Sequence, residues 1–148
     1  MKYLLDASAL IPLVTRRGKP LLIEASRENI VTTDLAIYEA CNSLWKLASL
    51  LKTFSLKDVL DIAVVLKDLS ANRIIQTVTF DKLDLPRVLE RACKERLTFY
   101  DASYIAIAED IKAILVTEDE TLRKVASKYV KTMTYGNLER TLKTGSRS

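Results

Sequence analysis

Four acidic residues stand where short apolar segments give way to helices or loops, or on the first turns of a following helix: Asp6, Glu39, Asp101 and Asp119. In an open α/β sheet the carboxyl ends of the strands meet at one edge, so residues distant in sequence can converge there. At about 5 Å and an effective dielectric constant of about 20, each like-charged pair costs on the order of 3 kcal/mol. Either some of these pKa values rise or a divalent cation neutralises the group, and we favour the cation.

Composition restricts the chemistry further. The chain has 148 residues, no histidine and two cysteines, Cys41 and Cys93. Two cysteines without histidine cannot complete a zinc site, and the Ser-His-Asp and Cys-His mechanisms are excluded as well. Carboxylates must therefore carry any acid-base work, and the length fits a single domain.

The charge balance permits binding to polyanions. There are 23 basic and 19 acidic residues, which gives a net charge of +4 and a pI near 9.1. Arg16, Arg17 and Lys19 follow the Asp6 turn, where they form either a phosphate-binding patch or an ordinary solvated face. No apolar run approaches the roughly 20 residues of a membrane span, and no signal peptide is recognisable, so we expect a cytoplasmic protein without membrane contact.

Strand-like and helix-like segments alternate along the chain. This alternation predicts a three-layer α/β fold with a parallel sheet of four or five strands covered by helices on both faces. We expect strands at 2–5, 30–33, 73–77, 113–117 and 130–134. Helices are expected at about 6–10, 20–28, 35–51, 56–69, from 84 through 93, from 101, at 120–127 and after Gly136. Residues 1–144 are read as one domain and 145–148 as a tail left by an expression vector.

Helical periodicity also predicts which side chains are buried. In the 35–51 helix the core stripe is expected to be Ile37, Cys41, Leu44, Ala48 and Leu51, with Asp34 as the N-cap. Glu39 lies off that stripe. The larger aromatic residues are expected in the core or between helices rather than as platforms for stacked bases: Tyr38, Trp45, Tyr100 and Tyr104.

The acidic motifs resemble those of PIN-domain nucleases. The matching segments are Tyr3-Leu-Leu-Asp-Ala-Ser-Ala9, Tyr38-Glu39, Tyr100-Asp-Ala-Ser-Tyr104 and Val116-Thr-Glu-Asp119, in the same order across nearly the whole chain. In length the chain is most similar to the VapC toxins of VapBC toxin-antitoxin pairs. The resemblance implies a PIN-like fold, an endoribonuclease that depends on Mg²⁺ or Mn²⁺, a cognate antitoxin and a homodimer.

The resemblance also assigns roles within the site. Asp6 and Asp101 are the expected direct metal ligands, while Glu39 and Asp119 orient metal-bound water or hold a second ion. The family's Thr-x-Asp pattern selects Thr117 and Asp119 over the adjacent Glu118. Ser8 either steadies the first acid or is an ordinary turn residue.

Other interpretations remain open at this point. Asp34, Asp101 and Asp119 each stand where an aspartate could simply cap a helix. A phosphoryl-receiver or flavodoxin-like module also places acids at strand ends, but its phosphorylated aspartate and its lysine do not stand here at suitable spacing. Within the resemblance, the alternatives are a housekeeping PIN ribonuclease in RNA maturation and a catalytically silent scaffold that binds RNA or protein.

Overall fold

The computed structural model describes residues 1–16 and 29–146. They form a five-stranded, fully parallel sheet in the order β3-β2-β1-β4-β5. The strands are β1 (Lys2–Leu5), β2 (Asn29–Thr33), β3 (Gln76–Val78), β4 (Ala113–Val116) and β5 (Thr132–Met133). The predicted fold class is therefore confirmed, although β3 begins later and β5 is shorter than the sequence suggested.

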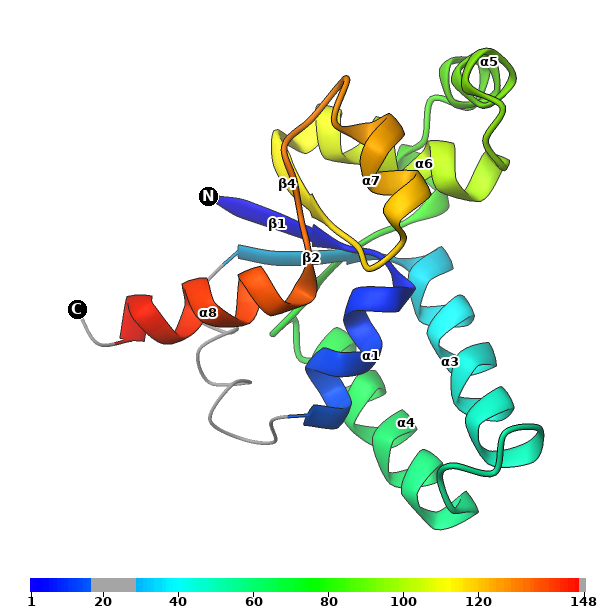
Figure 1. Ribbon diagram of the computed structural model, residues 1–148, viewed down its shortest axis with the longest axis vertical. Helices are drawn as coiled ribbons and strands as arrows, with labels where there is room; N and C mark the ends of the chain where they lie inside the picture. Colours follow the sequence, from blue (N-terminus) through cyan, green and yellow to red (C-terminus); the bar gives the residue numbers. More distant parts are fainter. Residues whose placement is uncertain (17–28, 147–148) are drawn as a thin grey trace.

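Helices cover both faces of the sheet (Figure 1). On one face lie α1 (Ala7–Arg16), α3 (Asp34–Ser49), α4 (Leu56–Ala71) and α8 (Tyr135–Ser146), and on the other lie α5 (Leu85–Glu95), α6 (Phe99–Ile111) and α7 (Glu120–Ala126). A short 3₁₀ helix, η1 (Phe80–Lys82), follows β3. The helix expected at 20–28 lies outside the described residues, and α8 includes the first two residues of the expected tail. None of the described helices is long and apolar enough to cross a membrane.

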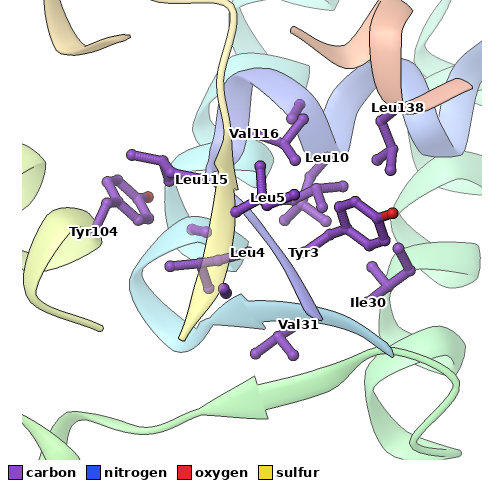
Figure 2. Close-up of a cluster of buried hydrophobic side chains, with 14 of the residues drawn as sticks. Tyr3, Leu4, Leu5, Leu10, Ile30, Val31, Tyr104, Leu115, Val116 and Leu138 are labelled. Atoms are coloured by element: carbon purple, nitrogen blue, oxygen red, sulfur yellow. The ribbon is translucent and has the colours of Figure 1, made fainter. Parts of the chain in front are cut away.

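The central strands send side chains into both layers (Figure 2). Leu4 lies with Leu115 and with Tyr104 of α6, whereas Tyr3 and Leu5 point toward the layer that contains α1 and α8. Leu4, Leu5 and Leu115 are fully buried. Because both faces are covered, these strands read as continuous apolar runs rather than as alternating patterns. This double burial fixes the position of the strand ends where the acids stand.

Helix α1 is longer than the short helix predicted at 6–10. It continues through Pro12, which lacks the N–H that an interior helical position normally donates. Leu10 and Leu13 on either side of the proline are both fully buried. Packing of these side chains outweighs the lost hydrogen bond, so the helix runs on to Arg16.

The buried face of α3 differs from the predicted stripe. Its buried residues are Ala36, Ala40 and Leu44, while Cys41 and Leu51 are exposed. The prediction was right for Leu44 but chose Ile37 and Cys41 in place of the smaller Ala36 and Ala40. Helix α3 packs against α1, and alanines allow a close approach. In α5, Val88 and Ala92 are buried, whereas Leu89 and Cys93 are exposed.

The expectation for the aromatic residues was wrong in three positions of four. Tyr38 is 77% exposed, Trp45 51% and Tyr100 54%, whereas Tyr104 is buried at 2%. Helical spacing alone cannot separate these cases, because an aromatic residue at the exposed edge of an apolar stripe has the same periodicity as one in the core.

Candidate active site

A cavity of about 300 Å³ lies at the carboxyl edge of the sheet, and all four acids line it. Asp6 directly follows β1 and Asp119 stands three residues after β4, while Glu39 projects from α3 and Asp101 from the first turn of α6. The structure thus brings together four residues that span most of the chain. The remaining lining residues are Ala7, Ser8, Asn42, Ser43, Lys46 and Tyr104.

Asp6 is the most buried of the four, at 6% exposure. Its Oδ1 accepts hydrogen bonds from the Ser8 hydroxyl at 2.6 Å and from the Ala9 amide at 3.1 Å, and its Oδ2 accepts one from the Thr117 hydroxyl. Burial raises the pKa of Asp6 and the charge of Glu39 adds to the rise, while the three hydrogen bonds oppose it. Both carboxylate oxygens are thus held in a fixed orientation.

Ser8 and Thr117 connect the first acid to the fourth. The Ser8 hydroxyl lies 3.3 Å from that of Thr117 and accepts a hydrogen bond from the Glu118 amide at 2.9 Å. Thr117 Oγ1 also accepts from the Asp119 amide at 3.1 Å. The loop after β4 is therefore tied to the turn after β1, which keeps Asp119 beside Asp6.

The effect of the acidic cavity on a pKa is clearest at Asp101. Burial, followed by the negative charges of the other three acids, raises the pKa of Asp101 to about 6. Nearby like charges have this effect because each opposes ionisation of the next. The four carboxylates therefore interact electrostatically, as expected of a site that a cation would neutralise.

The capping alternatives resolve differently at each aspartate. Thr33 rather than Asp34 caps α3, and Asp34 instead accepts a hydrogen bond from the Phe80 amide of η1 at 2.9 Å. Thr98 caps α6, which leaves the Asp101 carboxylate available to the cavity. Asp119 does cap α7, through Oδ1 and the Leu122 amide at 3.0 Å, and it lines the cavity as well.

Glu118 and Asp119 are adjacent in sequence, but their side chains make different contacts. Its Oε1 accepts a hydrogen bond from the Tyr135 amide at the start of α8. Asp119, and not Glu118, lines the cavity. This arrangement agrees with the choice of Asp119 in the fourth motif.

Two further features of the cavity accompany the four acids. Tyr104 donates a hydrogen bond from its hydroxyl to Glu39 Oε1 at 2.6 Å. Asn42, Ser43 and Lys46 extend from Glu39 along one side of α3, three, four and seven residues later. That spacing places these side chains on one helix face with Glu39, and the sequence alone indicates this polar face. The role of Tyr104 was missed, because the apolar pattern of α6 indicated only a core residue.

Of the predicted basic patch, only the backbone of Arg16 lies within the described residues. At about 1.5 Å per residue, α1 carries its last residue, Arg16, about 13 Å from its start beside Asp6. The expected short turn would have kept it closer. Arg17 and Lys19 lie outside the described residues.

The donor set suits a hard divalent cation. It consists of carboxylates and hydroxyls without histidine, and the two free cysteines, Cys41 and Cys93, lie outside the cavity lining. Among residues 1–16 and 29–146, no three acidic, cysteine or histidine side chains stand close enough to hold one ion together. Carboxylate and hydroxyl oxygens are ligands for ions such as Mg²⁺, which take one or two carboxylates directly and keep water as their other ligands.

Comparisons with known proteins agree with this geometry. The PIN domain family matches residues 3–128. "Exonuclease VapC9" of Pyrobaculum aerophilum is 38% identical over 128 residues, covering 82% of this chain and 84% of that protein. "Ribonuclease VapC3" of the same organism is 31% identical over 135 residues, covering 87% and 95%.

A solved structure shows the same similarity in three dimensions. The crystal structure of PAE2754 from Pyrobaculum aerophilum aligns with a TM-score of 0.75 and 31% identity, covering 97% of this chain and 98% of that one. A family match over most of the chain, curated relatives above 30% identity and a shared fold lead to one assignment. The chain belongs to the PIN-domain family and is a VapC-like nuclease.

Proposed function

We propose that this protein is a metal-dependent endoribonuclease and the toxin of a VapBC-type toxin-antitoxin pair. The observation that carries the proposal is the convergence of Asp6, Glu39, Asp101 and Asp119 from four separate elements into one cavity. Burial and mutual repulsion raise the pKa of both Asp6 and Asp101. A folded chain maintains such repulsion at a cost, and binding a cation offsets that cost.

The metal is proposed to be Mg²⁺ or Mn²⁺, with Asp6 and Asp101 as direct ligands. Such an ion supplies an acidified water nucleophile and neutralises charge on the phosphate. Ser8, Thr117 and the Ala9 amide hold Asp6 in its orientation, while Glu39 and Asp119 orient water at the other walls. Because water replaces the 2′-hydroxyl as nucleophile, the products are expected to carry 5′-phosphate and 3′-hydroxyl ends.

The test is cleavage of a panel of linear and circular RNAs by the purified protein with Mg²⁺, Mn²⁺ or EDTA. An endonuclease opens a circular RNA, whereas an exonuclease, the activity in the name of one relative, leaves it closed. We expect opening with either metal and none with EDTA. Metal binding without cleavage of any RNA would indicate the silent scaffold instead, and selective processing of one precursor RNA would favour the housekeeping nuclease.

A homodimer and an antitoxin are proposed as protein partners. Leucine, tyrosine and tryptophan side chains remain exposed along α3, α4 and their connection: Tyr38, Trp45, Leu50, Leu51, Leu56 and Leu60. Exposed apolar clusters of this kind are typical of protein-binding surfaces. An antitoxin would block the cavity most simply by inserting an Arg or Lys among the carboxylates, and excess Mg²⁺ should oppose that inhibition. Light scattering that shows a monomer at micromolar concentration would contradict the dimer.

A further inference from the structure

The contact between Tyr104 and Glu39 joins the two helical layers of the protein. Tyr104 lies on α6 and Glu39 on α3, and these helices cover opposite faces of the sheet (Figure 1). The phenol oxygen stands 2.6 Å from Glu39 Oε1, a short distance for a hydrogen bond to a carboxylate. Few side chains could span this gap, because the donor has to reach from the core to the edge of the cavity.

The ring of Tyr104 is fixed by packing. The residue is 2% exposed and lies against Leu4 and Leu115 of the central strands (Figure 2). A phenylalanine would fill the same space without a hydroxyl to desolvate. The hydroxyl instead lies at the point where the core meets the acidic cavity, and the partner it finds there is a cavity acid.

The spacing along α6 aligns the tyrosine with the third acid. Asp101 and Tyr104 stand three residues apart, so they share one face of the helix, and both line the cavity. One helix therefore presents an acid directly and orients a second acid through the phenol. One oxygen of Glu39 is committed to Tyr104, and the other is available to the cavity.

We propose that Tyr104 is a positioning residue of the nuclease site, which holds Glu39 in the orientation that metal-bound water requires. The proposal rests on the proposed function for the identity of the reaction, but not for the contact itself. Partners that orient metal-site ligands commonly contribute about 10- to 100-fold in metal affinity or activity. Glutamate has three rotatable bonds, so without the phenol its carboxylate would sample several orientations.

The test compares Tyr104→Phe with Tyr129→Phe in the full chain. Tyr129 is a matched control because its hydroxyl also donates to a glutamate, Glu95, at 2.6 Å. Neither Tyr129 nor Glu95 lines the cavity. Mn²⁺ affinity is measured by calorimetry, and RNA cleavage is followed at saturating metal. We expect Tyr104→Phe to weaken Mn²⁺ binding or lower kcat by about 10-fold or more with little change in KM, and Tyr129→Phe to change neither.

A double-variant cycle separates positioning from general stability. If Tyr104 acts through Glu39, adding Tyr104→Phe to Glu39→Gln should cause little further loss, because the carboxylate it orients is already gone. Equal losses in both backgrounds would overturn the proposal, as would a wild-type Mn²⁺ affinity and kcat in Tyr104→Phe.

Two further arms keep the test decisive. Should Tyr104→Phe fail to fold, Glu39→Asp shortens the acid by one methylene on the helix surface and breaks the contact from the other side. A wild-type Mn²⁺ affinity and kcat in Glu39→Asp would also overturn the proposal. If the wild-type protein binds Mn²⁺ but cleaves no RNA, the proposed function fails, while the Mn²⁺ affinities still decide whether Tyr104 positions Glu39.

Discussion

At the scale of single residues, the same acid type performs different tasks according to its neighbours. Asp101 leaves the capping of α6 to Thr98, so its carboxylate faces three other acids. Asp119 caps α7 and lines the cavity at the same time. The Asp101 carboxylate therefore serves the site at a cost in stability, whereas the Asp119 carboxylate serves the site and also stabilises a helix. Substitutions should separate these effects.

Replacing Asp101 by Asn should abolish cleavage and stabilise the metal-free protein at neutral pH. The folded-state pKa is raised from 3.8 to about 6, so this aspartate disfavours the folded state increasingly as pH rises from about 4 through 6. With allowance for solvent screening, the gain from Asn at pH 7 is on the order of 2 kcal/mol. Urea unfolding at pH 7 should show the difference, and it should vanish near pH 3.5.

Asp110→Asn provides the control for that comparison. Asp110 lies on the same helix but pairs with Arg87 outside the cavity. Loss of a surface ion pair should cost about 0–1 kcal/mol, opposite in sign to the effect at Asp101, with cleavage unchanged. A wild-type or reduced stability for Asp101→Asn at pH 7 would show that the acids do not repel one another as the geometry indicates.

Asp119 allows its two roles to be tested by a pair of variants. Asparagine caps helices about as well as aspartate and removes a charge that repels Asp101, so Asp119→Asn should lose cleavage without any loss of stability in the metal-free protein. Asp119→Ala should lose cleavage and also about 1 kcal/mol of stability. Ser55→Ala, which removes the cap of α4, should cost a similar amount without affecting cleavage. Full cleavage by Asp119→Asn would leave this residue with a capping role alone.

At the scale of elements, the sequence predicted the positions of the strands, and of the acids that follow them, better than it predicted the buried faces of the helices. Acids that follow apolar strands are visible as a pattern, because strand ends must meet at one edge of a parallel sheet. The contact of Tyr104 with Glu39 could not be predicted, since its neighbours Ile105 and Ala108 are also buried. A periodic apolar pattern shows which side chains are buried, but not where a hydroxyl group finds its partner. The contacts of α3 were misjudged because helix-to-helix distance, which selects alanine over a larger residue, depends on tertiary structure.

The close packing of α3 can be tested by enlarging one side chain. Ala40 is fully buried and adjoins Glu39 in the chain, whereas Cys41 next to it is exposed. Ala40→Leu should overpack the contact with the core and cost about 1–3 kcal/mol of unfolding free energy. Cys41→Leu should change stability by less than about 0.5 kcal/mol. Equal effects in chemical denaturation would mean that Ala40 does not face the core more closely than Cys41 does.

At the scale of the whole molecule, an acidic cavity is embedded in a chain of net charge +4. A cation neutralises the cavity locally, and the remaining basic residues then dominate the field that a nucleic acid encounters. Lys46 lies at the boundary between these regions, since it lines the cavity two helical turns after Glu39. An ammonium group in that position can contact the RNA backbone where it enters the site.

Lys46→Gln should therefore weaken RNA binding and reduce its dependence on salt. Each phosphate contact contributes about 0.9 to the slope of log affinity against log salt for duplex DNA and about 0.7 for single strands, so the variant should lower the slope by just under one unit. Lys57→Gln is the matched control, because Lys57 is 87% exposed on α4 and pairs with Asp61 outside the cavity lining. Filter binding with catalytically inactive Asp101→Asn protein, over a range of salt concentrations, measures both slopes without cleavage. Equal slopes for the two lysine variants would place Lys46 on an ordinary solvated face. A larger loss of RNA affinity in Arg16→Ala or Arg17→Ala would instead assign the main phosphate contact to these two arginines.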